Sequence, residues 1–327
     1  MTVANRFGRR EFIGAAVTFG VCTAMGAKMR REPLMLDTKR MSIHDGPGIR
    51  TTIFFKGCNL RCNWCANPES QQTCSQLTLD REKCTGCGSC AALCPSQARE
   101  MKDGHPAVRA HACTLCGKCM EECPAGAIGR EGCDMTVEEV LAEALKDAAF
   151  YRQSGGGVTF SGGEPLLQQE FATALARSLH ENGVSVAIET AAAVPAAHFR
   201  EFLHEVDYVH IDLKHCDSAR HRVGTGMGNE QILENICAVR DSGLPYLVRI
   251  PVIPGFNDAL EDAAGFAKLL VSLGIQAVQL LPFHQMGEKK YSLLGREYAH
   301  AGQAQLHRED LEQYRQTMLR HGLDARF

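Results

Sequence analysis

Apolar and polar positions along most of the chain follow two alternating periods. Short runs rich in β-branched and aromatic residues predict six strands, at residues 51–55, 158–160, 184–188, 206–213, 246–253 and 276–281. Apolar residues three and four positions apart predict the helices between them, at residues 136–150, 167–182, 195–205, 230–242 and 260–273. Thr136 and Glu139 have the spacing of a capping box at the start of the first helix. Strands separated by helices pair in parallel, so we expect an α/β fold with a partial (β/α)6 TIM-like barrel.

Residues 76–132 interrupt this alternation and are rich in cysteine. Two runs there have the spacing C-x2-C-x2-C-x3-C followed by proline; they contain Cys84, Cys87, Cys90 and Cys94, and Cys113, Cys116, Cys119 and Cys123. This spacing is typical of bacterial ferredoxins with two [4Fe-4S] clusters, in which the fourth cysteine of each run ligates the other cluster. We therefore expect a ferredoxin-like α+β insertion. In it Cys123 completes the cluster of the first run, and Cys94 completes that of the second. The main alternative, paired zinc knuckles, would use C-x2-C pairs with long gaps.

A third group of cysteines, Cys58, Cys62 and Cys65, has the spacing C-x3-C-x2-C directly after the strand at 51–55. Three thiolates on one short loop suggest one metal centre, and a [4Fe-4S] cluster held by three thiolates leaves one iron open to bind a substrate. A zinc site with a borrowed histidine and a set of disulfide bonds are the alternatives. Both are disfavoured, because the loop contains no histidine and the other cysteine runs have the spacing of iron–sulfur proteins.

Composition limits the partners of the chain. The net charge of −3 over 327 residues leaves little electrostatic support for nucleic-acid binding. The 16 cysteines indicate a reducing, cytoplasmic setting. The N-terminal stretch conflicts with this, because Arg9 and Arg10 followed by apolar residues 15–25 are similar to a twin-arginine export signal. That stretch is too short to span a membrane. We favour a misassigned start or an added extension over export, and expect no membrane partner.

Polar groups follow each expected strand, and in barrels of this kind function gathers at the carboxyl ends of the strands. The groups are the Gly162-Gly163-Glu164 turn, Glu189, Asp212 with Lys214, Arg249 and His284. Glycines let the backbone approach a ligand closely, and Glu164 could receive an amino group, although a plain turn is the alternative. Each of the others also has a structural explanation, such as an ion pair between Asp212 and Lys214. Their alignment at successive strand ends favours a binding site for an amino acid and a ribose.

Together these motifs resemble the glycyl radical enzyme activating enzymes of the radical S-adenosylmethionine (SAM) superfamily. The resemblance runs from about Leu36 to the C-terminus and includes residues 42–51, the three cysteine runs, and residues 161–165, 212–214, 251–254 and 281–284. It implies an N-terminal extension at 1–35, a radical SAM barrel at 36–75 and 133–327, and the insertion at 76–132.

The resemblance also implies site residues. Cys58, Cys62 and Cys65 would carry the cluster that chelates the amino and carboxylate groups of SAM. The implied SAM contacts are Trp64, Ala66, Gly162, Gly163, Glu164, Asp212, Leu213, Lys214 and His284. Family members place a monovalent cation near residues that match Glu189 and Asp212. The chain departs from the family pattern at residues 191–193, where a glycine or cysteine commonly stands.

The activity implied by the resemblance is reductive cleavage of SAM to methionine and a 5'-deoxyadenosyl radical, which takes hydrogen from a backbone glycine of a partner glycyl radical enzyme. The implied cofactors are three [4Fe-4S] clusters and SAM, and the implied electron donor is flavodoxin or ferredoxin. Two alternatives are a radical SAM enzyme acting on a small molecule or another peptide, and a non-catalytic electron carrier. Arg249 is a candidate to hold a peptide carbonyl or carboxylate, with a structural ion pair as the alternative.

Overall fold

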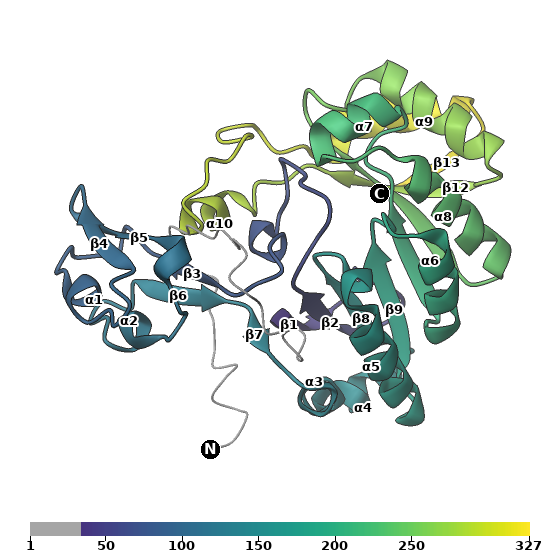
Figure 1. Ribbon diagram of the computed structural model, residues 1–327. Coiled ribbons are helices and arrows are strands. Elements are labelled where there is room, and N and C mark those ends of the chain that lie inside the picture. Colours follow the sequence, from purple (N-terminus) through teal and green to yellow (C-terminus); the bar gives the residue numbers. More distant parts are fainter. Residues whose placement is uncertain (1–33) are drawn as a thin grey trace.

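A computed structural model describes residues 34–327 (Figure 1), and the twin-arginine-like stretch lies outside that range. Within the described residues the main sheet has nine strands in the order β13-β12-β11-β10-β9-β8-β2-β1-β7. The six expected strands are confirmed as neighbours, each pair parallel. They are β2 (Arg50–Phe55), β8 (Gly157–Gly162), β9 (Ser185–Thr190), β10 (Tyr208–Asp212), β11 (Tyr246–Val252) and β12 (Ala277–Pro282).

Three further strands extend the two edges of this sheet. At one edge β13 (Asp324–Arg326) pairs in parallel with β12. At the other edge β1 (Leu34–Ser42) is antiparallel to β2, and β7 (Cys133–Asp134) is antiparallel to β1. Because β7 and β13 end the order without pairing to each other, the described sheet is an open, partial barrel. This agrees with the expected fold class.

The expected helices are present, with one difference. The helix expected at 136–150 is divided: α3 (Val137–Ala144) begins at a capping box between Thr136 and Glu139, and α4 (Ala148–Ser154) follows a short 3-10 turn. The others are α5 (Gln169–Glu181), α6 (Ala196–Phe202), α8 (Glu230–Ser242) and α9 (Leu260–Ser272). The sequence analysis missed α7 (Ser218–Thr225), α10 (Glu288–Leu293) and α11 (Glu312–Arg320). Among the described residues, no helix combines the length and apolar character needed to cross a bilayer.

The parallel strands at the centre of the barrel are buried on both faces. Val158, Phe160, Val186 and Ile188 share one face of the sheet, and Thr159 and Ala187 share the other. All six are fully buried, as expected when helices cover one face and side chains fill the other. Arg50, itself buried, donates to Thr159 Oγ1 (2.7 Å) and to backbone carbonyls of β8 and β9. It therefore ties three strands together at the end of the barrel opposite to the expected site.

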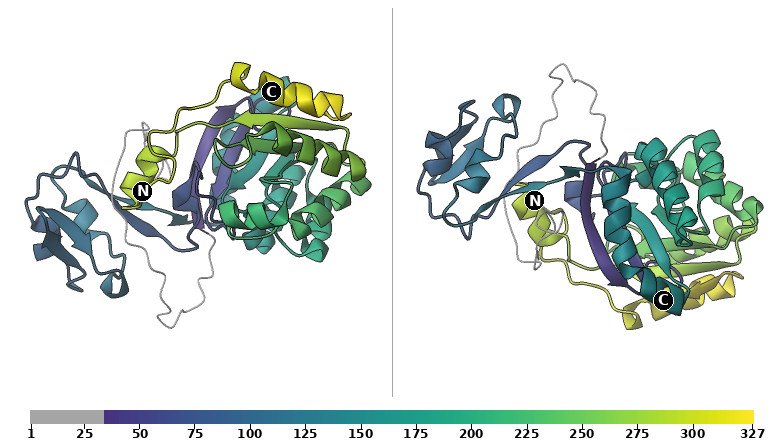
Figure 2. Two further views of the ribbon diagram at one scale, coloured as in Figure 1. Left: turned by 90° about the horizontal axis from the view of Figure 1, so that it is seen from above. Right: turned by 90° about the horizontal axis from the view of Figure 1, so that it is seen from below.

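The cysteine-rich unit, residues 76–132, projects from the barrel (Figure 1). It contains two antiparallel pairs, β3 (Gln76–Leu79) with β6 (Ile128–Glu131) and β4 (Arg99–Lys102) with β5 (His105–Val108). Two short helices, α1 (Ser89–Ala92) and α2 (Lys118–Glu121), complete it. Both views of Figure 2 place the α10 segment between this unit and the barrel, where Lys290 pairs with Glu69 (2.6 Å). The unit has its own small core around Leu77, Leu79, Ala127 and Ile128.

Candidate functional site

The three-cysteine loop, residues 58–65, begins where β2 ends and lies over the carboxyl edge of the sheet. The Gly57 N–H donates to the carbonyl of Ser70 (2.6 Å), and the Arg61 N–H donates to that of Thr225 (2.7 Å). The Trp64 ring packs on Phe256, with centroids 4.6 Å apart. These contacts with distant segments fix the loop, so its cysteines hold their places without a regular element.

The Gly162-Gly163-Glu164 turn packs against the strand that leads into this loop. A Cβ added to Gly163 would lie 2.0 Å from the carbonyl oxygen of Gly57, so only glycine fits there. The Glu164 N–H donates to that same oxygen (2.7 Å). The close approach in this structure is therefore between two segments of the chain, and it explains why the turn needs glycine.

Glu164 is buried under this turn and acts as an acceptor for the next loop. Its carboxylate accepts from Thr190 Oγ1 (2.7 Å), the Ala191 N–H (3.1 Å) and the Leu166 N–H (3.3 Å). Burial raises the pKa of Glu164 to about 7, against the effect of these donors. Glu164 thus joins the ends of β8 and β9 beside the three-cysteine loop.

A buried network of charges joins the ends of β9, β10 and β11. The strand register places Asp212 beside Arg249 and His210 beside Glu189. Arg249 Nε contacts Asp212 Oδ1 (2.9 Å), and Arg249 Nη1 contacts Glu189 Oε1 (2.6 Å). The Lys214 ammonium contacts the other oxygen of Asp212 (2.8 Å).

This network stays ionised despite its burial. Burial opposes ionisation of Asp212, but Arg249 and Lys214 hold the pKa of Asp212 well below its usual range. Burial likewise opposes the charge on Glu189, but Arg249 lowers the pKa of Glu189 to about 2. The structure therefore shows Arg249 in an ion pair, the second of its two expected roles. Its guanidinium lies between the two carboxylates for which the resemblance implied a monovalent cation.

Of the thiols of the three-cysteine loop, Cys62 is buried and Cys58 and Cys65 are partly buried. Burial raises the pKa of Cys58 and of Cys62 to about 12, and it also raises that of Cys65. The ammonium of Lys214 opposes this shift at each of the three. Buried thiolates need a positive partner, and iron supplies one. The residues present therefore fit a metal cluster at this loop.

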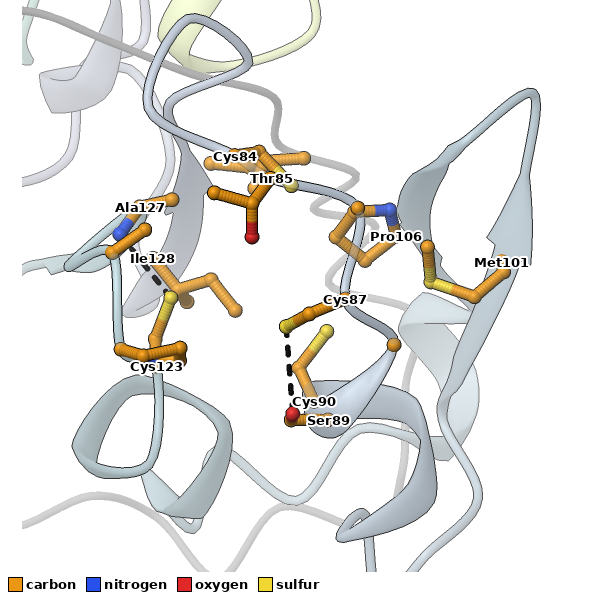
Figure 3. A pocket seen from close by; sticks show the side chains of 15 residues that line it. Cys84, Thr85, Cys87, Ser89, Cys90, Met101, Pro106, Cys123, Ala127 and Ile128 are labelled. Carbon is orange, nitrogen blue, oxygen red and sulfur yellow. Dashed lines mark hydrogen bonds between the residues drawn. The ribbon is translucent and has the colours of Figure 1, made fainter.

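The two runs of the cysteine-rich unit surround two hollows. Hollow A is open in part to solvent and is lined by Cys84, Cys87, Cys90 and Cys123 (Figure 3). Hollow B is likewise open in part and is lined by Cys94, Cys113, Cys116 and Cys119. The fourth cysteine of each run thus lines the hollow of the other run, which is the crossed grouping that the spacing predicts.

Backbone donors point at sulfur in both hollows. The Ala127 N–H lies 3.3 Å from Cys123 Sγ (Figure 3), and the Ala98 N–H lies 3.2 Å from Cys94 Sγ. Such donors stabilise thiolate ligands and fit an iron–sulfur cluster in each hollow. Across residues 34–327, no three Cys, His, Asp or Glu side chains converge on a point for a single metal ion.

The remaining site residues predicted from the sequence differ in their exposure to solvent. Trp64 is buried, Ala66 is half-buried and His284 is exposed at the end of β12. The Leu213 side chain is fully buried, and its N–H donates to the carbonyl of Arg249 (2.9 Å). The loop cysteines, Glu164, Asp212 and Lys214 therefore form one group, and the His284 side chain is more exposed than the members of that group.

The sequence analysis missed two residues that contact members of the candidate site. His210 lies 3.4 Å from Glu189, and its position two residues before Asp212 on one strand placed both on the same face, a signal that the sequence contained. Phe256 has no such signal, because its contact with Trp64 joins loops that are distant in sequence.

Comparisons with known proteins agree with this geometry. A family model described as the radical SAM superfamily matches residues 52–267. The isethionate sulfite-lyase activating enzyme of Desulfovibrio desulfuricans is 40% identical over 82% of this chain and 88% of its own. The benzylsuccinate synthase activating enzyme of Thauera aromatica is 42% identical over 89% of this chain and 91% of its own. The crystal structure of a radical SAM methyltransferase from Sphaerobacter thermophilus, at 16% identity and a TM-score of 0.50, covers 90% of this chain and 76% of its own and shares the fold.

An open parallel barrel with a three-cysteine loop at its carboxyl edge defines the class of enzymes that cleave SAM with an iron–sulfur cluster. The chain belongs to the radical SAM superfamily and, within it, to the activating enzymes of glycyl radical enzymes. It is an enzyme that cleaves SAM to a 5'-deoxyadenosyl radical and activates a partner glycyl radical enzyme.

Proposed function

We propose that Cys58, Cys62 and Cys65 hold the [4Fe-4S] cluster that binds SAM. The observation that carries this assignment is three thiols on one loop, with Cys62 buried and Cys58 and Cys65 partly buried, beside the ammonium of Lys214 and at the carboxyl edge of the parallel strands. When bound, the cluster supplies one electron to the sulfonium of SAM. The protein orients SAM and excludes water from the radical.

The polar groups next to the loop have assigned parts in this proposal. Lys214 is the buried cation that holds the methionine carboxylate of SAM, and Asp212 keeps Lys214 in place (2.8 Å). Arg249 and Glu189 in turn hold Asp212, so they position the site without contacting SAM. The remaining walls of the proposed SAM site are formed by Trp64, Ala66, the Gly162-Gly163-Glu164 turn, Leu213 and His284.

Hollows A and B hold two further [4Fe-4S] clusters in the same proposal. Support comes from the four cysteines around each hollow and the backbone donors aimed at Cys94 and Cys123. These clusters carry electrons from flavodoxin or ferredoxin toward the barrel. Thiolate clusters need reducing conditions, so the proposal places the enzyme in the cytoplasm.

The partner in this proposal is a glycyl radical enzyme of the type that the similar proteins activate. The two activating enzymes named above, for isethionate sulfite-lyase and benzylsuccinate synthase, are nearly equal in sequence identity to this chain. Identity therefore leaves both classes of partner open. Incubating the reduced enzyme and SAM with each purified partner, and measuring the glycyl radical by electron paramagnetic resonance (EPR), distinguishes them.

Iron content tests the cluster assignment. Anaerobic reconstitution should give about twelve irons per chain, from three four-iron clusters. The Cys87→Ala and Cys116→Ala variants should each lose about four irons. Both should still cleave SAM with dithionite, yet cleave it slowly with reduced flavodoxin. A parent protein that saturates at about four irons, with freely alkylated cysteines in residues 84–123, would remove both hollow clusters from the proposal.

A further inference from the structure

The cysteine-rich unit is built from two similar halves, which can be compared position by position. In each half a glycine in the left-handed region, Gly88 or Gly117, precedes a four-residue helix. In each half the alanine four residues after the last cysteine donates its N–H to that cysteine's sulfur, as noted above. The two hollows therefore have equivalent walls over most of their surface.

One pair of equivalent buried positions differs in charge. The residue five positions after Cys123 is Ile128, which lines hollow A, and the residue five positions after Cys94 is Arg99, which lines hollow B. Both are 5% exposed. A buried guanidinium in hollow B thus occupies the place that an isoleucine occupies in hollow A.

Arg99 has little to balance its charge. Its Nη2 lies 3.6 Å from Cys119 Sγ, whereas its Nε and Nη1 have no hydrogen-bond partner. Within residues 34–327 it has no carboxylate partner at hydrogen-bonding distance, since Glu100, its neighbour in sequence, pairs with Arg109. A guanidinium does not lose its proton in a protein, and burying it without an anion is costly. An anion in hollow B would remove that cost.

We propose that Arg99 raises the reduction potential of the [4Fe-4S] cluster in hollow B above that of the cluster in hollow A. The inference rests on the proposed function, which places a cluster in each hollow. Reduction adds one negative charge to a cluster, and a fixed cation in a buried site stabilises that charge. The charge of Arg99 also acts on Cys90 in hollow A, but its one hydrogen bond goes to Cys119 in hollow B.

The two clusters are therefore unequal one-electron acceptors. A one-electron donor such as reduced flavodoxin loses one electron, and the cluster in hollow B gains it before the cluster in hollow A does. The sequence alone contains the asymmetry, but only the structure shows that Arg99 is buried and turned toward a thiol.

A redox titration monitored by EPR tests the assignment on the full chain in the Cys58→Ala background, where only the two hollow clusters remain. The parent of this series should show two separate one-electron steps. Arg99→Ile places in hollow B the residue that hollow A has. It should lower the reduction potential of the upper step, the one at the higher potential, by at least about 59 mV, which is a tenfold change in the ratio of reduced to oxidised cluster. Arg99→Lys keeps the charge and should keep the upper step.

Two more variants serve as controls. Ile128→Arg places a cation in hollow A and should raise the lower step. Arg109→Leu removes an exposed positive charge from the same unit and should move neither step, because solvent screens that charge.

Iron analysis of each sample separates the possible failures. If the parent of the series binds fewer than about eight irons, the proposed clusters are absent and the inference falls with them. If about eight irons are bound and Arg99→Ile moves neither step, the inference is overturned while the proposed function stands. If Arg99→Ile loses a cluster, the Ile128→Arg variant provides the test instead. A lower step at the same potential in Ile128→Arg as in the parent would overturn the inference.

Discussion

Replacing Gly163 with alanine should disturb the three-cysteine loop without replacing any of its three cysteines. The new Cβ would lie 2.0 Å from the carbonyl oxygen of Gly57, the residue before Cys58. Ordinary contact begins at 3.4 Å, so the two segments must separate by about 1.4 Å. Gly163, unlike Gly162 with its φ of +105°, is outside the left-handed region, so the substitution adds this contact and no backbone strain.

The displacement should affect stability modestly and catalysis strongly. Overpacking of this kind costs about 1–3 kcal/mol of the free energy of unfolding. A misplacement of about 1 Å in a catalytic group can lower a rate by about a hundredfold. We therefore expect Gly163→Ala to fold with a lower melting temperature and to form 5'-deoxyadenosine about a hundredfold more slowly with dithionite and SAM.

Gly183→Ala provides the control for this experiment. Gly183 lies in the turn between α5 and β9, with φ at +70° and no atom within 4 Å of an added Cβ. Its replacement should cost about 1–2 kcal/mol through backbone strain and leave the rate of the folded enzyme unchanged. A Gly163→Ala enzyme with the parent rate would refute the claim that this contact positions the loop.

Three other substitutions test the charged groups. Arg249→Met should lower the free energy of unfolding by about 3–5 kcal/mol in urea titrations, because Glu189 and Asp212 lose the guanidinium that they share. SAM cleavage and glycyl radical formation should fall together, and a selective loss of glycyl radical formation would assign Arg249 to peptide binding. Lys214→Met should weaken SAM binding roughly tenfold to a hundredfold by equilibrium dialysis, and unchanged affinity would remove Lys214 from the site. Asp147→Asn should cost about 1–3 kcal/mol at pH 7, because Asp147 accepts from Arg40 (2.7 Å). That bond lowers the pKa of Asp147 below 3.8, so its stabilisation is present above pH 3.8 and is lost as the pH falls through the lowered pKa. The difference from the parent should therefore shrink at pH 3, and a constant difference would contradict the assignment.

The sequence predicted the parallel strands well because each is buried on both faces and reads as a short apolar run. It could not predict β7 or β13, which have two and three residues and no measurable periodicity. The helix α7 was missed because its segment, SARHRVGT, is mostly polar and contains glycine. Its first turn is instead fixed by Asp217, whose side chain accepts from the Arg220 N–H (2.8 Å).

The candidate site was predictable as a set of strand ends, but the pairing within it was not. Glu189, Asp212, Lys214 and Arg249 were each identified, because residues that follow parallel strands gather at one edge. Which carboxylate meets Arg249 depends on strand register, and the sequence does not define the register. The role of Arg99 likewise depends on its burial in hollow B, which only the packing of the unit shows.

The most direct test of the central claim is the yield of 5'-deoxyadenosine from the Cys58→Ala enzyme. The variant should be reconstituted anaerobically, reduced with dithionite and supplied with SAM, alongside the parent. If the three-cysteine loop holds the SAM-cleaving cluster, the variant should retain about eight irons in hollows A and B and form no 5'-deoxyadenosine. Formation of 5'-deoxyadenosine by the variant at the parent rate would contradict the account.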